Sequence, residues 1–134
     1  MSEPFTLKII APSGVIYENE VVSVSVPGSE GRFQILRNHA PFLSGVKIGE
    51  LDVVEKDGKK RRFAVTNGFS HVENNTMVLL TDSAEPGEII DVERAKAALK
   101  RAEERIQAKD RSIDVERARL ALARALNRLK VAGS

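Results

Sequence analysis

The chain has 134 residues, a mass of 14.7 kDa, no cysteine and a net charge of +2. Its size allows one ordinary hydrophobic core, or a small core with an appendage. The composition excludes a disulfide framework and thiolate chemistry. The sequence has no apolar run of about 18 residues for a transmembrane helix, and it opens with Met-Ser-Glu-Pro, which lacks the features of a signal peptide. We therefore expect a soluble, unprocessed chain with no direct membrane insertion.

Charge and composition change abruptly near residue 90. Residues 1–90 carry 9 basic and 12 acidic side chains, whereas residues 91–134 carry 12 basic and 7 acidic ones, together with 10 of the 14 alanines. All five prolines and all six aromatic residues precede this point. The shift predicts two units of different class, a domain at residues 1–85 and a second unit with its linker at 86–134. Proline and glycine in residues 81–87 mark that linker.

The first unit has the pattern of an all-β domain. Apolar side chains alternate with others in residues 5–9, 22–26 and 61–66, and Val22, Val24 and Val26 are expected on one side of a strand. Turn signals separate these runs. Asp57-Gly58 is the strongest hairpin signal, because both residues tolerate the positive φ of a tight turn. Many short strands without an intervening helix predict an antiparallel sandwich or barrel.

The second unit has the pattern of a helical hairpin. The sequence Ile-Asp-Val-Glu-Arg-Ala occurs at 90–95 and again at 113–118, and each copy places an aspartate, Asp91 or Asp114, where a helix N-cap belongs. Each copy opens an apolar stripe with heptad-like spacing. The stripes are Val92, Ala95, Leu99, Ala102 and Ile106, and Val115, Ala118, Leu122, Ala125 and Leu129. A short turn at 109–112 makes the helices antiparallel. Two such helices bury little surface and need the β domain, a ligand or a partner to be stable.

Residue patterns of known active sites are missing from the sequence. There is no phosphate-loop motif and no nucleophile-elbow signature, and His39 and His71 lack the neighbours of a metal site. We therefore predict no catalytic residue and no bound metal. The run Lys-Lys-Arg-Arg at 59–62 is either a docking patch or a solvated hairpin that discourages edge pairing, and the second interpretation is preferred.

Four arginines of the hairpin suggest an anion site. Arg94 and Arg101 share a face of the first helix, and Arg124 and Arg128 share a face of the second. In an antiparallel hairpin the four guanidinium groups can converge at the linker end, where the helix N-terminus adds its positive dipole. Arginine also binds phosphate bidentately. Spacing alone leaves two interpretations open, a polyphosphate site and a solvated polar face.

Three stretches of the chain carry further motifs. Residues 31–41 contain a glycine, an Ile-Leu pair and a His-x-Pro, residues 65–73 contain Gly-Phe-x-x-Val, and the first repeat copy has the form Ile/Leu-Asp-x-x-Arg-Ala. Together with the order of the domains, these motifs resemble the epsilon subunit of the rotary F-type ATP synthase along essentially the whole chain. Arg37 stands where that family usually has proline and Gln34 where glycine is common. Both departures lie in the region that, by the resemblance, faces the membrane rotor ring.

The resemblance implies a fold and a function. The fold is α+β, an N-terminal antiparallel β-sandwich of about ten short strands followed by a C-terminal antiparallel two-helix hairpin. The sandwich of this non-catalytic central-stalk subunit docks on the gamma subunit and the c-ring, on the cytoplasmic side of the bacterial inner membrane. The hairpin either folds against the sandwich or extends toward the catalytic beta and alpha subunits and inhibits ATP hydrolysis. ATP, as a regulatory ligand, favours the folded form.

The same resemblance assigns candidate residues. The positions that contact ATP are Glu85, Ile90, Asp91, Arg94, Arg101, Arg124 and Arg128. The partner contacts of the extended hairpin are Arg111, Arg117, Arg119 and Arg124. The loop that faces the rotor ring carries Glu30, Arg32 and His39. No evident ligand set requires magnesium. Structural roles stay open, since Asp91 caps a helix in either case and Ile90 can simply pack.

Two other functions compete with this one. A nucleic-acid or scaffold adaptor would use the basic hairpin and the pI near 9.0 to bind phosphates. The hairpin has no aromatic residue for base stacking, however, and Glu103 and Glu104 interrupt its arginines, so we expect no nucleic acid. A coupling shaft would keep the rotor role without a nucleotide. The motif at residues 90–95 favours ATP binding over the shaft.

Overall fold

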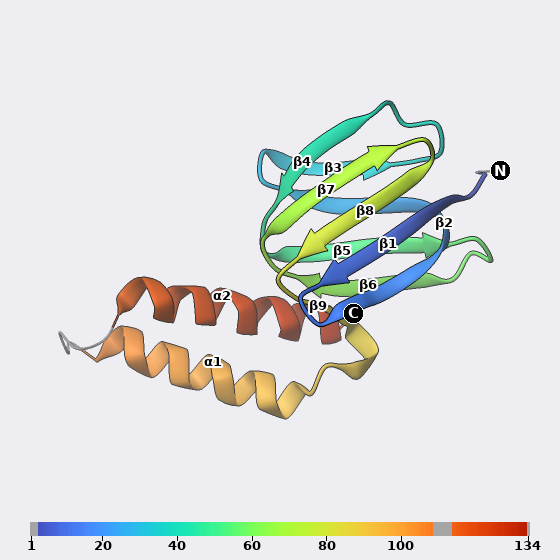
Figure 1. Cartoon of the computed structure of the whole chain (residues 1–134). Helices are drawn as coiled ribbons and strands as arrows, with labels where there is room; N and C mark the ends of the chain where they lie inside the picture. The colour runs from blue at the N-terminus through green and yellow to red at the C-terminus, as the bar shows by residue number, and fades with distance from the viewer. Residues whose placement is uncertain (1–2, 109–113, 134) are drawn as a thin grey trace.

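The computed structural model describes residues 3–108 and 114–133, which form a β-sandwich and a helical hairpin that projects from one edge (Figure 1). The strands are β1 (Phe5–Ala11), β2 (Gly14–Gly28), β3 (Gly31–Ile35), β4 (Phe42–Val46), β5 (Gly49–Glu55), β6 (Lys60–Val65), β7 (Gly68–Glu73), β8 (Thr76–Thr81) and β9 (Ala84–Pro86). The helices are the 3-10 helix η1 (Gly87–Ile89), α1 (Val92–Gln107) and α2 (Val115–Ala132). The α+β class is confirmed, with nine strands in the described residues where about ten were predicted.

The long strand β2 joins the two layers of the sandwich. Its first half pairs with β1 and its second half with β3 and β5. One layer therefore has the order β4-β7-β8-β1 and the other the order β3-β2-β5-β6-β9. The strand pairs are antiparallel except for β1 and β8, which are parallel. A parallel pair needs a long connection, which the strands between β1 and β8 supply. Among the strands of the described residues, this pair is the one departure from the predicted antiparallel pattern.

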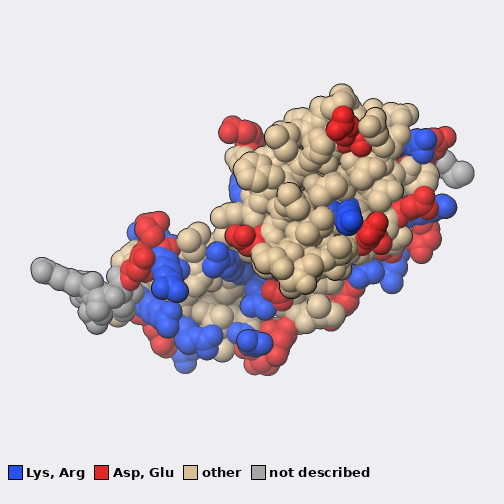
Figure 2. Space-filling model, in the orientation of Figure 1, with Lys and Arg blue, Asp and Glu red and all other residues tan. Residues whose placement is uncertain are grey.

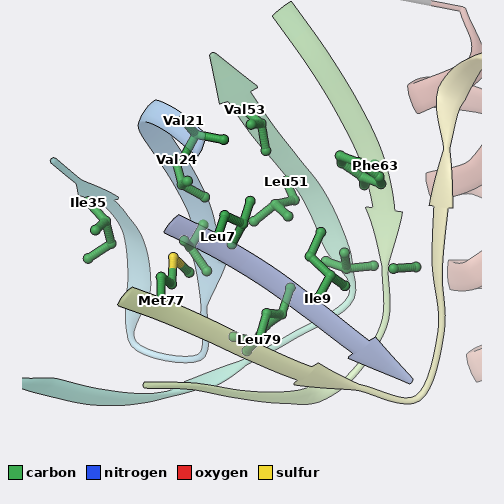
Figure 3. Close-up of a cluster of buried hydrophobic side chains, with 14 of the residues drawn as sticks. Leu7, Ile9, Val21, Val24, Ile35, Leu51, Val53, Phe63, Met77 and Leu79 are labelled. Atoms are coloured by element: carbon green, nitrogen blue, oxygen red, sulfur yellow. The ribbon is translucent and has the colours of Figure 1, made fainter. Parts of the chain in front are cut away.

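The core lies between the two layers and is built from alternate residues of the strands. Figure 3 shows its central side chains, among them Leu7, Ile9, Leu51, Phe63 and Leu79, all 0% exposed. The alternation predicted for residues 5–9 is confirmed, because every second residue of β1 is buried. The hairpin is attached to the outside of this core domain.

Two local predictions in the sandwich need correction. Val22, predicted to share one side of the strand with Val24 and Val26, is the extra residue of a β-bulge. Val21 is buried with those two residues in its place, since a bulge shifts the alternation by one residue. Asp57-Gly58 does form the turn between β5 and β6, but only Gly58 has a positive φ, of 90°. The N–H of Gly58 donates to the carbonyl of Glu55 (2.8 Å). This is a type I turn followed by a glycine bulge, which needs a single residue with positive φ.

The predicted caps of the hairpin are confirmed and its apolar stripes in part, because Val92 and Val115, the first residue of each stripe, are 39% and 42% exposed. The carboxylates of Asp91 and Asp114 accept hydrogen bonds from the backbone N–H groups of Arg94 (3.0 Å) and Arg117 (3.2 Å). The alanines of the two stripes are at most 3% exposed: Ala95, Ala102, Ala118 and Ala125. Small residues at these positions allow close approach of α1 and α2. The predicted turn at 109–112 lies outside the described residues.

The segment predicted as a linker, residues 81–87, is mostly part of the sheet. Thr81 ends β8, and Ala84–Pro86 forms β9, which pairs with β6 at the edge of its layer. Proline has no N–H for a further ladder bond, so it suits the end of an edge strand. The chain leaves the sheet there and enters η1, and Ile90 then packs with 7% exposure before α1 begins.

Candidate functional site between the sandwich and the hairpin

The last turns of α2 hold the hairpin on the sandwich, with α2 lying between α1 and the sheet (Figure 1). The side-chain amide of Asn127 donates to the backbone carbonyls of Gly49 (2.8 Å) and Val65 (3.3 Å). The ammonium of Lys130 lies 2.6 Å from a carboxylate oxygen of Glu50. The hairpin is therefore attached at one end, and the first turns of α2 project beyond the sandwich.

A cavity of about 180 Å³ lies at this junction. It is lined by Ala64, Thr66, Ser83, Glu85, Arg124, Asn127 and Arg128. Three of the predicted ATP contacts thus come together here. Nη2 of Arg128 lies 2.9 Å from a carboxylate oxygen of Glu85, and the exposed Arg124 lies one helical turn before Arg128. The hairpin supplies guanidinium donors and the sandwich supplies a carboxylate.

The other predicted ATP contacts do not line this cavity. Arg94 and Arg101 are exposed on α1. Figure 2 shows basic side chains gathered over the hairpin, outside the sandwich. Ile90 is buried beside Ala64, and the carboxylate of Asp91 caps α1. In this structure Ile90 therefore packs and Asp91 caps a helix, the structural roles considered for them in the sequence. Of the four arginines expected to converge, the structure places two at the cavity.

Glu50 carries the electrostatic part of the attachment. Its side chain is 15% exposed, 2.6 Å from Nζ of Lys130 and 3.6 Å from Nη1 of Arg62. The hydrogen bond from Lys130 lowers the pKa of Glu50, burial opposes this, and the charges of Lys130, Arg62 and Arg32 lower it further. The carboxylate is therefore held ionised at the point where it binds α2.

This lowered pKa predicts a pH dependence of docking. Because the pKa of Glu50 is lower in the docked chain than in the unfolded one, its stabilising contribution is fully present above the ordinary carboxyl pKa of about 4.3. The contribution is lost as the pH falls through the lowered value. We expect the protection of the α2 amides, which is the slowing of their exchange relative to the intrinsic rate at the same pH, to fall on acidification below about pH 4. Glu50→Gln is expected to lower this protection already at pH 7. Equal exchange in Glu50→Gln and the wild type at pH 7 would contradict this role.

The residues predicted to face the rotor ring lie along the β3–β4 edge of the sandwich. Glu30, in the turn before β3, and Arg32, within β3, line a second cavity of about 520 Å³. His39 follows β3, and its ring packs edge-on against Phe42 with 5.6 Å between the centroids. The three residues share one edge but not one loop, because β3 separates Glu30 from His39. Their contact with a ring stays a prediction.

Two of the residues predicted to contact partner subunits from the extended hairpin lie near the start of α2. Arg117 and Arg119 are exposed, and Nη1 of Arg119 lies 3.2 Å from a carboxylate oxygen of Glu116. Arg124 lies farther along, at the cavity. Arg111 is outside the described residues. The two exposed arginines are available to an acidic partner surface.

An apolar face of the sandwich was missed in the sequence. Leu43, Phe69 and Leu80 are 68%, 61% and 51% exposed on the layer β4-β7-β8-β1. Phe69 lies directly opposite Leu80 in the β7–β8 register. Figure 2 shows this side of the sandwich as largely uncharged. A contiguous apolar patch of this kind marks an interaction site. The available signal was the apolar run at 77–80, since a strand covered on both faces loses its alternation.

The fold and the site between its two parts define the class of protein to which this chain belongs. A β-sandwich with one apolar outer face carries a helical hairpin, and the end of one helix docks that hairpin beside a cavity lined by arginine and carboxylate groups. Residues 4–87 match the family described as ATP synthase, Delta/Epsilon chain, beta-sandwich domain, and residues 88–133 match its long alpha-helix domain. The chain belongs to the delta/epsilon chain family of ATP synthase.

Similar proteins cover almost the whole chain. The ATP synthase epsilon chain of Desulforamulus reducens is 44% identical over 132 residues, 98% of this chain and 99% of the relative. That of Pelotomaculum thermopropionicum is 45% identical over 127 residues, 95% and 94% of the two chains. A chain in the cryo-EM structure of the Euglena gracilis mitochondrial ATP synthase (OSCP/F1/c-ring) is 25% identical with a TM-score of 0.83, over 98% of this chain and 82% of that one.

These relationships establish the resemblance to the epsilon subunit seen in the sequence. An epsilon chain is a subunit of the central stalk, and the catalytic sites of ATP synthase are on its beta subunits. Among the described residues, no helix is long and apolar enough to cross a membrane.

Proposed function

We propose that this chain couples the gamma subunit to the c-ring and inhibits ATP hydrolysis when its hairpin leaves the sandwich, and that ATP favours the docked hairpin. The observation that carries the proposal is the composition of the cavity. Glu85 belongs to the sandwich, whereas Arg124 and Arg128 belong to the hairpin. A ligand bound there contacts both parts only while the hairpin is docked, so it stabilises that state by its differential affinity.

The chemistry of the cavity suits a nucleotide phosphate. Arginine pairs with phosphate bidentately, and the charge makes these hydrogen bonds strong. Ligand pockets are usually larger than about 300 Å³, so a cavity of about 180 Å³ takes only part of ATP. The remainder would extend over the hairpin, where Arg94 and Arg101 are exposed. This assigns all four arginines of the predicted set to one ligand.

The partners follow from the surfaces. The apolar face around Phe69 is proposed to dock on the gamma subunit, because burying such a patch is the main source of stability in a permanent interface. The edge with Glu30, Arg32 and His39 is proposed to face the c-ring. The extended hairpin would present Arg117 and Arg119 to the catalytic beta and alpha subunits. These contacts would place the chain peripherally on the cytoplasmic side of the bacterial inner membrane.

One observation favours the coupling shaft as the second candidate. Glu85 already pairs with Arg128 in the folded form, so the docked hairpin needs no anion to neutralise that guanidinium. A shaft of this kind keeps the sandwich contacts and shows no response to nucleotide. Membership of the ATP synthase family gives no support to the nucleic-acid adaptor.

ATP titration of the isolated chain separates the sensor from the shaft. Calorimetry is expected to show binding, and ATP at 100 times its dissociation constant should stabilise the docked chain by about 2.7 kcal/mol. Arg124→Ala and Arg128→Ala should each weaken binding by about 1.5–3 kcal/mol, the range for hydrogen bonds to charged groups. Arg119→Ala, which removes an exposed arginine of the same helix, is the matched control. Absence of binding at millimolar ATP would favour the shaft, and wild-type affinity in either variant would exclude that arginine from the site.

A further inference from the structure

The docked hairpin has attachments that use none of the predicted nucleotide contacts. The side-chain amide of Asn127 donates to the carbonyls of Gly49 and Val65, and these two residues are paired with each other in the β5–β6 ladder. One side chain thus binds both strands at the end of their ladder. This contact fixes the position of α2 along the strands.

Helix stability does not explain asparagine at position 127. Asparagine is a poorer helix former than the leucine and alanine that dominate α2. Its cost inside a helix is offset here by two hydrogen bonds that reach across to the sandwich. Asn127 therefore stabilises the docked hairpin, although it lowers the intrinsic stability of α2.

A second attachment depends on the missing side chain of Gly87. A Cβ at this position would lie 3.0 Å from the carbonyl oxygen of Val131 and 3.3 Å from its Cγ1, closer than carbon atoms normally approach. Val131 is 1% exposed and belongs to a buried cluster with Ala64 and Ile90. Glycine at 87 lets the last turn of α2 settle against this cluster, beside the start of η1.

We propose that Asn127 and Gly87 are positioning residues that keep the hairpin docked in the absence of nucleotide. The inference deepens the proposed function and rests on it for the meaning of the docked state. Because the donors of Asn127 are already used and Arg128 is already paired with Glu85, docking does not wait for a ligand. ATP then changes the stability of a docked hairpin that forms without it, and these two residues determine the fraction of chains that are docked before ATP binds.

The test measures docking in the full chain without nucleotide. The chain has no cysteine, so Lys60→Cys on β6 and Lys100→Cys on α1, both exposed, accept a pair of spin labels for distance measurements. Asn127→Leu keeps the size of the side chain and removes its donors. It is expected to raise the ratio of undocked to docked chains about tenfold, since two partly buried hydrogen bonds between the sandwich and α2 are lost. Gln107→Leu, which also replaces a side-chain amide with leucine but at an exposed position of α1, should leave the ratio unchanged. Asn127→Gln should keep part of the docking.

Gly87→Ala gives an independent measurement. It should also raise the undocked fraction, whereas Gly133→Ala, at the end of α2, should not. The melting of the sandwich should stay the same in all variants, which separates positioning from general stability. Wild-type docking in Asn127→Leu or in Gly87→Ala overturns the role of that residue. A wild-type chain that docks but ignores added ATP would contradict the sensor in the proposed function and leave this inference standing, because every distance here is measured without nucleotide.

Discussion

Deleting residues 88–134 is expected to raise ATP hydrolysis by the assembled enzyme while the shortened subunit stays bound. In the proposed mechanism the hairpin alone inhibits, and the docking surfaces belong to the sandwich. The increase in the rate of ATP hydrolysis depends on the fraction of enzymes that the hairpin inhibits. If about 90% of the enzymes had extended hairpins, the deletion would raise the rate about tenfold. β9 ends at Pro86, so the deletion leaves every described strand intact. Steady-state hydrolysis and the amount of subunit in the purified enzyme are the two measurements.

Two substitutions complete that experiment. Phe69→Asp should give the opposite result, loss of the subunit from the enzyme, because it places a charge in the apolar face proposed to bind gamma. Leu120→Asp, at a 43% exposed leucine of α2, is the matched control and should leave assembly unchanged. Loss of the shortened subunit, or unchanged hydrolysis with the subunit bound, would contradict the division of roles between sandwich and hairpin.

The hairpin could be predicted because its signals are local. Asp91 and Asp114 each cap a helix through a residue three positions away. The apolar stripes repeat every three or four residues, so a short window contains the whole signal. The same holds for the turn at Gly58. Here the sequence and the structure differ only in the type of turn.

The rest of the sandwich depends on pairing between distant segments. The bulge at Val22 lies where β2 changes its pairing partner from β1 to β5. The segment expected to be a linker contains β9, which pairs with the edge of β6. Neither fact is present in a short window of sequence. Tertiary pairing therefore decided both the exact register and the end of the first domain.

The candidate site was predictable only in part for the same reason. Arg124 and Arg128 were found by their helical spacing and Glu85 through the family resemblance, and the structure brings the three together. Asn127 was missed because its partners lie 78 and 62 residues away, at Gly49 and Val65. A side chain whose role is a contact with a distant backbone carbonyl leaves no pattern in its own neighbourhood.

The strength of regulation has a physical limit. ATP shifts the hairpin only by its differential affinity for the docked and extended states. A shift from 1:99 to 99:1 takes about 5.5 kcal/mol, whereas each charged contact contributes about 1.5–3 kcal/mol. We therefore expect a graded response to ATP, with the docked fraction at zero nucleotide set by the attachments of α2.

The central claim is that undocking of the hairpin is the inhibitory step, and a disulfide lock tests it most directly. Ala64 on β6 and Val131 on α2 belong to one buried cluster, and the chain has no cysteine of its own to mispair. Ala64→Cys with Val131→Cys is therefore the pair chosen to join the sandwich to the hairpin. The oxidised enzyme is expected to hydrolyse ATP without inhibition and to show no further activation by added ATP. Reduction of the disulfide should restore both the inhibition and the activation by ATP. Persistent inhibition of the fully oxidised enzyme would contradict the account.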